Sequence, residues 1–213
     1  MNTAAVFDFD GTLMDTEPAI MASFEHVFRK YRTVEEFTPE RRIKVLGPAL
    51  DLMMKEFFPE MDPWVCVEEY RRYQRENLRD LIHPMPGAVE MLAKLSAMEV
   101  PCAIVSTRYF KSLAELLKLN RMDGFMSVVL GNDSVSRSKP DPEGILKAWD
   151  MLGKENCFYI GDSVMDVEAG RNAGAVTVAY PSNEGKRNDL IAAKPDYLIE
   201  QLSELPDLIR KES

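Results

Sequence analysis

A short apolar run near the start of the chain, residues 4–7, ends in Asp8, Asp10 and Gly11. Runs of this kind form strands buried on both faces of a parallel sheet. Side chains two apart on a strand point the same way, so we expect Asp8 and Asp10 to project together from its end. At about 5 Å and an effective dielectric of about 20, their repulsion is roughly 3 kcal/mol. A nearby cation, lysine or shared proton would offset that repulsion.

Taken alone, the two aspartates are equally compatible with a turn cap beside a solvated carboxylate. The composition narrows the alternatives. The 213 residues suit one large domain or a domain with an insert, and 46% are hydrophobic. A net charge of −9 argues against a nucleic-acid binder that works by neutralising phosphates. No apolar run approaches the roughly 20 residues of a membrane span, and no cleavable leader is visible, so we expect a cytoplasmic protein.

The three cysteines, Cys66, Cys102 and Cys157, are widely spaced and odd in number. This pattern indicates small buried residues in a reducing compartment rather than disulfides or a metal site.

Two kinds of pattern divide the chain. Apolar residues recur at helical spacing over 16–80, whereas strands and helices alternate from residue 81 onward. We predict an α/β fold, a doubly wound parallel sheet with an inserted all-helical cap. The core would comprise 1–15 and 81–213, and the cap 16–80. The expected later strands are 102–105, 127–130, 157–160 and 175–179.

Polar side chains follow the predicted strands or lie in loops on their carboxyl side. Ligands of doubly wound sheets bind at that edge, so these side chains should share one pocket. An oxygen-rich pocket of this kind favours a hard cation, most simply Mg²⁺, and the added lysine and hydroxyls suit a phosphoryl group. The residues are Asp8, Asp10, Ser106, Thr107, Lys139, Asp162 and Asp166.

The same residues resemble the haloacid dehalogenase-like hydrolase superfamily. Its four motifs occur in order and the resemblance covers essentially the whole chain; the helical insert is similar to that family's mobile cap. The motifs are Asp8-Phe9-Asp10-Gly11-Thr12-Leu13, Ser106, Ser138-Lys139-Pro140-Asp141-Pro142, and Gly161-Asp162-Ser163-Val164-Met165-Asp166 with Ala169-Gly170 and Ala173-Gly174.

The resemblance implies a role for each catalytic residue. Asp8 would be the nucleophile that carries a covalent aspartyl-phosphate. Asp10 would protonate the leaving oxygen and then deprotonate the attacking water. Ser106 would hydrogen-bond a phosphoryl oxygen. Lys139 would screen the negative charge, an effect of roughly 4 kcal/mol for a pair at 4 Å in a moderate dielectric.

The resemblance also implies the metal ligands. Mg²⁺ would lie between the Asp8 carboxylate, the Asp10 backbone carbonyl and Asp162, with Asp166 binding or orienting it. Two structural alternatives stay open: Ser106 also suits a helix cap, and Asp166 suits a first-turn position stabilised by the helix dipole.

Substrate binding is less well defined. Thr107 and Arg108 stand where relatives often carry asparagine and lysine, which leaves their contribution open. In the cap, Arg42 and Gly47 lie in a segment that resembles the specificity loop of the phosphoglycolate phosphatase and pyrophosphatase branch.

Asp10 argues against a dehalogenase, which lacks this acid/base residue. A phosphosugar mutase of the β-phosphoglucomutase type would carry a cap histidine where this chain has Ile20. We therefore expect a Mg²⁺-dependent phosphatase that hydrolyses a small phosphomonoester or pyrophosphate, acting as a monomer or weak homodimer. Two alternatives stay open: a phosphosugar mutase of the β-phosphoglucomutase type, and a non-catalytic binding protein with the same fold.

Overall fold

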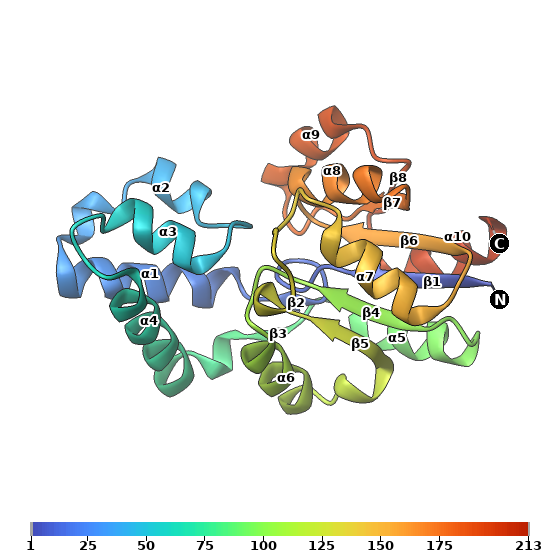
Figure 1. Ribbon diagram of the computed structural model, residues 1–213, viewed down its shortest axis with the longest axis horizontal. Coiled ribbons are helices and arrows are strands. Elements are labelled where there is room, and N and C mark those ends of the chain that lie inside the picture. The colour runs from blue at the N-terminus through green and yellow to red at the C-terminus, as the bar shows by residue number, and fades with distance from the viewer. Residues whose placement is uncertain (1, 213) are drawn as a thin grey trace. The chain divides into compact units, whose positions relative to one another are not determined.

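The computed structural model describes residues 2–212, and these form two compact units (Figure 1). One unit comprises the residues up to Met14 together with those from Pro84 onward, and the other is Asp15–His83. The helical unit thus begins at Asp15 rather than residue 16, and the chain returns at Pro84 rather than residue 81. The expected outer limits at residues 1 and 213 lie outside the described residues. The short strands β2 (Met14–Asp15) and β3 (His83–Pro84) mark the two crossings.

The larger unit is built on a six-stranded parallel sheet in the order β5-β4-β1-β6-β7-β8. The opening run forms β1 in the middle of this sheet, and all five of its residues are buried. This confirms the predicted α/β class with a parallel sheet. The strands are β1 (Thr3–Phe7), β4 (Cys102–Val105), β5 (Met126–Leu130), β6 (Asn156–Gly161), β7 (Val176–Ala179) and β8 (Tyr197–Leu198).

Helices cover the sheet on both faces, as the doubly wound pattern requires. Apolar residues of α7 (Glu143–Leu152) and α8 (Val164–Ala173) pack with Val6 and Tyr159 on one face. In Figure 1, α7 lies in front of the sheet and α5 (Ala88–Ala97) behind it. The remaining helices of this unit are α6 (Phe110–Leu119), α9 (Glu184–Ala193) and α10 (Leu205–Glu212).

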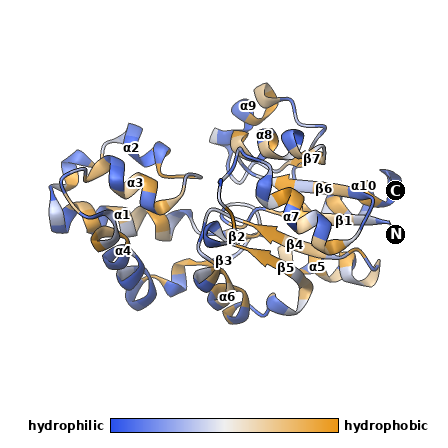
Figure 2. Cartoon of the chain, in the orientation of Figure 1, coloured by the Kyte–Doolittle hydropathy of each residue, from blue (hydrophilic) through white to orange (hydrophobic). Residues whose placement is uncertain are grey.

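The smaller unit is helical and has its own aromatic core. Phe24 and Phe28 of α1 pack with Phe37, Phe57 and other apolar side chains, so this unit buries its hydrophobic surface independently of the sheet. Figure 2 shows the polar faces of these helices alternating with apolar ones. The helices are α1 (Glu17–Tyr31), α2 (Pro39–Lys44), α3 (Leu50–Phe57) and α4 (Pro63–Asn77).

The structure corrects the expectation in two places. The helical spacing expected over 16–80 is interrupted after α2, where the chain turns at Gly47, which has φ +109°, and at Pro48. Helix α9 was not expected, because it buries only Leu190 and so lacks a clear apolar stripe. Strand β8, which has two residues, was not expected either.

All three cysteines are buried and free. Among the described residues, no helix is both long and apolar enough to span a membrane.

Candidate active site

The register of the sheet brings three motifs to one edge. Phe7 pairs with Ile104 of β4 and with Ile160 of β6, so the residues that follow each of them leave the sheet side by side. The Asp8 backbone N–H donates to the Ile160 carbonyl at 2.8 Å, which fixes the end of β1 against β6. Asp8, Ser106 and Asp162 therefore emerge at neighbouring positions on the carboxyl edge.

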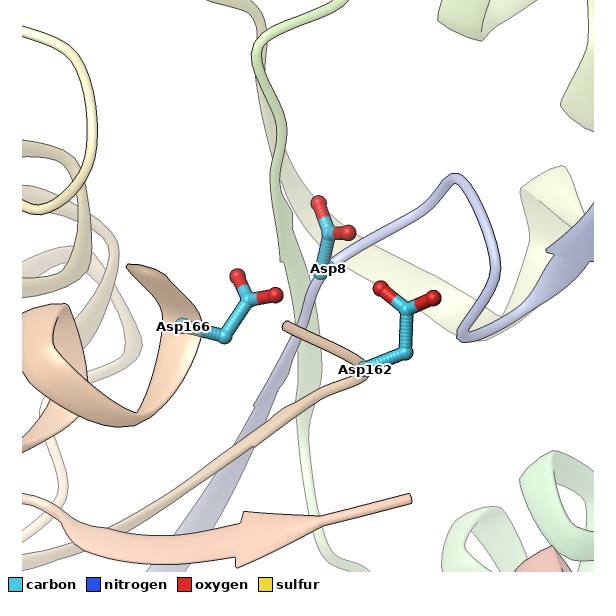
Figure 3. Close-up of side chains that lie close together, drawn as sticks. All are labelled: Asp8, Asp162 and Asp166. Carbon is cyan, nitrogen blue, oxygen red and sulfur yellow. The ribbon is translucent and has the colours of Figure 1, made fainter. Parts of the chain in front are cut away.

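Three buried carboxylates converge at this edge. Figure 3 shows Asp8 at the end of β1, Asp162 just after β6 and Asp166 in the first turn of α8, with their carboxyl groups turned toward one another. One oxygen from each lies within 4.8 Å of the others. Their relative exposures are 6%, 3% and 1%, so solvent screens their repulsion poorly.

Lys139 joins two of these carboxylates. Its ammonium nitrogen lies 2.7 Å from Asp8 Oδ1 and 2.6 Å from Asp166 Oδ1, and its side chain is only 6% exposed. The lysine comes from the loop before α7, far along the chain from β1. This buried ammonium between two buried acids supplies the positive charge that Asp8 needs nearby.

Asp8 and Asp166, the two acids that share Lys139, differ in the direction of their pKa shifts. Burial raises the pKa of Asp8, with Asp166 and Asp162 adding to the rise and Lys139 opposing it. Burial also acts to raise the pKa of Asp166, but Lys139 and hydrogen bonds from Ser163 and Tyr159 lower it below its ordinary value. Asp166 is therefore the better-stabilised anion, and Asp8 is the one whose charge depends on further positive charge nearby.

Lys139 remains charged in this setting. Burial acts to lower its pKa, but Asp166 and Asp8 together raise it well above its ordinary value.

Gly11 makes the close approach of two loops possible. It has φ +84°, and a Cβ built there would lie 2.1 Å from Asp162 Oδ2. Any side chain would displace the Asp162 carboxylate, so the glycine after Asp10 is required by space as well as by backbone conformation.

Asp10 has a partner that the sequence did not reveal. Arg108 donates from Nη2 to Asp10 Oδ1 at 2.6 Å and from Nε to Asp10 Oδ2 at 3.1 Å. Arg108 is held in turn by Ser112 Oγ at 3.1 Å, and its backbone N–H donates to Ser106 Oγ at the same distance. Thr107 lies half-buried between Ser106 and Arg108.

Sequence reasoning also missed two groups around Asp162. Lys186 contacts Asp162 Oδ2, and Ser182 Oγ donates to the same oxygen at 2.8 Å. Burial raises the pKa of Asp162, and Lys186 acts against that rise. Both residues belong to the segment around the start of α9, where no element was expected.

Asp166 is similarly held by neighbours. Tyr159 donates to Asp166 Oδ1 at 3.0 Å, and Ser163 caps α8 through a reciprocal capping box with Asp166. The Ser-x-x-Asp spacing at 163–166 was the available signal for this capping arrangement.

The sequence of this chain is similar to those of known proteins. Residues 5–180 match the family model described as "Haloacid dehalogenase-like hydrolase". The chain belongs to this family. The pyrophosphatase PpaX of Listeria monocytogenes is 34% identical over 215 residues, covering 99% of this chain and 97% of its own. The PpaX of Halalkalibacterium halodurans is 31% identical and covers 96% of this chain and 95% of its own.

Two solved structures share the fold of this chain. A hydrolase from Pseudomonas syringae is 25% identical with a TM-score of 0.80, covering 99% of each chain. A predicted phosphoglycolate phosphatase from Haemophilus somnus 129pt is 19% identical with a TM-score of 0.85, covering 98% of this chain and 99% of its own.

The donor set of this hydrolase fits a hard divalent cation. The oxygens of Asp8, Asp162 and Asp166 are the ligand type that Mg²⁺ prefers, and they lie close enough to surround one ion. Three buried carboxylates face two lysines, Lys139 and Lys186, which leaves negative charge that a cation would offset.

The two cap residues predicted to bind substrate, Arg42 and Gly47, lie in the helical unit. The Arg42 guanidinium lies over the Phe37 ring at 4.4 Å, donates to the Phe37 carbonyl at 3.2 Å and pairs with Glu25 at 3.4 Å. Gly47 is exposed in the turn after α2. Their contact with substrate stays a prediction.

Proposed function

We propose that this hydrolase is a Mg²⁺-dependent phosphatase that cleaves a small phosphomonoester, such as phosphoglycolate, or pyrophosphate through an aspartyl-phosphate on Asp8. The observation that carries the proposal is the buried bridge from Lys139 to Asp8 and Asp166 beside Asp162. The name pyrophosphatase, given to relatives 34% identical to this chain, supports the choice of substrates.

The first step is attack on phosphorus. A carboxylate oxygen of Asp8 bonds to phosphorus, the bond from phosphorus to the leaving oxygen breaks, and Asp10 gives that oxygen a proton. Lys139 holds the Asp8 carboxylate at 2.7 Å and so fixes its direction of attack. The Ser106 oxygen accepts from the Arg108 backbone N–H, which leaves its own proton for a phosphoryl oxygen.

The second step returns Asp8 to its starting state. A water oxygen attacks phosphorus, Asp10 accepts the water's proton, and the bond between Asp8 and phosphorus breaks to release inorganic phosphate. The bidentate contact from Arg108 keeps the Asp10 carboxylate in one orientation for both proton transfers.

Asp8, Asp162 and the Asp10 backbone carbonyl would hold the Mg²⁺, which would supply positive charge to the phosphoryl oxygens. Both Asp166 oxygens already accept hydrogen bonds, from Lys139, Tyr159 and Ser163. Asp166 would therefore orient Lys139, or bind the ion by giving up one of these hydrogen bonds.

The substrate would also meet residues outside this cluster. Thr107 and Arg108 follow Ser106 at the sheet edge, and Arg42 and Gly47 are the cap residues that we assign to recognition of the rest of the substrate. Arg42 is suited to a carboxylate or second phosphate because its guanidinium is always charged.

The test is a panel of phosphoesters assayed with Mg²⁺ and with a chelator. The panel should contain pyrophosphate, phosphoglycolate, sugar phosphates and nucleotides, and Asp8→Asn is the matched inactive control. We expect release of inorganic phosphate from pyrophosphate or phosphoglycolate, lost on chelation and in Asp8→Asn. Turnover that survives the chelator would refute the metal, and isomerisation of a sugar phosphate without phosphate release would indicate a mutase instead.

A further inference from the structure

The acidic cluster contains a second lysine whose role the proposed chemistry does not use. Lys186, in the first turn of α9, contacts Asp162 Oδ2, and Ser182 donates to the same oxygen at 2.8 Å. The Asp162 side chain is 4% exposed and that of Lys186 is 24% exposed. Lys186 therefore reaches the buried carboxylate from the solvent side.

The charges in the cluster are nearly balanced without any bound ion. Lys139 pairs with Asp8 and Asp166, and Lys186 pairs with Asp162. Among the described residues in these ion pairs, three carboxylates face two ammonium groups. A divalent cation added to this set would lie close to two positive side chains, and like charges at short range in a buried site repel strongly.

The oxygen that Lys186 occupies is also the one that faces the first loop. Asp162 Oδ2 lies nearest to the space beside Gly11, where a Cβ would come within 2.1 Å, whereas Oδ1 would be 3.2 Å from that Cβ. The Asp10 backbone carbonyl, the proposed ligand from this loop, directly precedes Gly11. Asp162 Oδ2 is therefore the carboxylate oxygen nearer to this loop, and Lys186 and Ser182 already contact it.

Lys186 is placed where it can move. Helix α9 buries one residue, Leu190, which packs with Val167 and Ala179. Helix α9 therefore has few buried apolar contacts, and a segment of this kind opens at low cost.

We propose that Lys186 is an internal counter-ion of the metal-free enzyme that competes with Mg²⁺ for Asp162. Without the ion, Lys186 neutralises Asp162 and stabilises the cluster. When the ion binds, the ammonium leaves Asp162 and the first turn of α9 shifts. This inference rests on the metal site of the proposed function and adds that the affinity of that site is set in part by Lys186.

The test compares Lys186→Met with two matched variants of the whole chain. Lys186→Arg keeps the charge, and Arg187→Met removes a charge from the same helix, where Arg187 pairs with Glu200 away from the cluster. Mg²⁺ binding is measured by calorimetry without substrate, and the melting temperature is measured in excess chelator.

We expect Lys186→Met to bind Mg²⁺ more tightly by about tenfold or more, the change that roughly 1.4 kcal/mol of relieved repulsion produces. The same variant should melt at a lower temperature in chelator, because Asp162 then lacks its counter-ion. Lys186→Arg and Arg187→Met should resemble the parent chain in both measurements.

Equal or weaker Mg²⁺ binding by Lys186→Met would overturn the inference while leaving the metal site intact. Failure of every variant, the parent included, to bind Mg²⁺ would overturn the metal site and this inference together. A raised KM with unchanged Mg²⁺ affinity would instead make Lys186 a substrate contact, which also contradicts the competition.

Discussion

The Arg108 guanidinium donates two hydrogen bonds to the Asp10 carboxylate, from Nη2 to Oδ1 at 2.6 Å and from Nε to Oδ2 at 3.1 Å. The two side chains come from loops 98 residues apart and are 11% and 22% exposed. A planar bidentate pair of this kind fixes orientation as well as charge. The contact makes Arg108 a positioning residue for Asp10, in addition to any contact that it makes with substrate.

Arg108→Met should therefore lower kcat more than it changes KM. Loss of the fixed Asp10 orientation should cost about tenfold or more in kcat, since proton transfer depends on alignment. Steady-state kinetics on the best substrate of the panel measures both constants. Arg108→Lys keeps the charge but cannot form the bidentate contact, so it should recover only part of kcat. A large rise in KM with kcat unchanged would show that Arg108 acts on the substrate alone.

Gly11→Ala should abolish activity because the added methyl group crowds the Asp162 carboxylate, not because of backbone strain. The new Cβ would fall 2.1 Å from Asp162 Oδ2 and push that carboxylate away. Gly87→Ala is the matched control, because Gly87 also has a positive φ, +78°, but its Cβ would meet nothing within 4 Å. Both variants should lose about 1–2 kcal/mol of stability from the left-handed backbone. Only Gly11→Ala should lose activity, by about a hundredfold or more; equal activity losses would contradict the crowding at Asp162.

Lys139→Met should destabilise the fold because it leaves two buried carboxylates without their ammonium. Breaking a buried pair in this way costs about 3–5 kcal/mol. Urea unfolding in chelator measures the loss. Lys147→Met is the control, since Lys147 is exposed and donates to the Ser134 carbonyl rather than to a carboxylate of the cluster. A loss below about 1 kcal/mol would mean that the acids are not held by Lys139.

A second cluster, in the helical unit, predicts how stability depends on pH. Glu69 of α4 is 8% exposed and contacts Arg72 at 2.6 Å, Lys30 at 2.7 Å and His26 at 2.6 Å. The Arg72 hydrogen bond, with Lys30 and His26, lowers the pKa of Glu69 from 4.5 to about 2 against the opposing effect of burial. A lowered carboxyl pKa stabilises the folded state above the unfolded pKa, and this contribution is lost as pH falls from 4.5 toward 2.

Glu69→Gln should therefore destabilise the chain at neutral pH and progressively less below pH 4.5. Solvent screens the half-exposed Lys30 and Arg72, so we expect a loss of about 1–2 kcal/mol. Urea unfolding at a series of pH values measures it. Glu76→Gln, which removes an exposed partner of Arg72, is the control and should change little. A Glu69→Gln cost that is independent of pH would contradict the charged cluster.

Much of the fold could be predicted because its signals are local. Residues 4–7 of β1 are all apolar, and the later strands alternate with helices of clear amphipathic pattern. Hydrophobic periodicity and turn residues were therefore enough to predict these elements. Helix α9 was not predicted because only Leu190 is buried in it, and a helix with one buried apolar residue has no apolar stripe to detect. The break between α2 and α3 was not predicted, because the helical spacing of apolar residues continues across the turn at Gly47 and Pro48.

The site divides in the same way. Asp8, Lys139, Asp162 and Asp166 could be grouped because each follows a strand or lies in a loop at one edge of a parallel sheet. The pairs Arg108–Asp10 and Lys186–Asp162 could not be predicted, because they depend on the direction that long side chains take from loops of irregular backbone. Sequence spacing places a residue at an edge, whereas its hydrogen-bond partner is decided by packing.

The central claim, that Asp8 carries the phosphoryl group, is tested most directly by acid-quenching the enzyme during turnover and weighing its peptides by mass spectrometry. The peptide that contains Asp8 should gain the mass of one phosphoryl group when pyrophosphate or phosphoglycolate is present with Mg²⁺. Asp8→Asn should show neither the adduct nor turnover. Full turnover by Asp8→Asn, or a phosphoryl group found on another residue, would contradict the account.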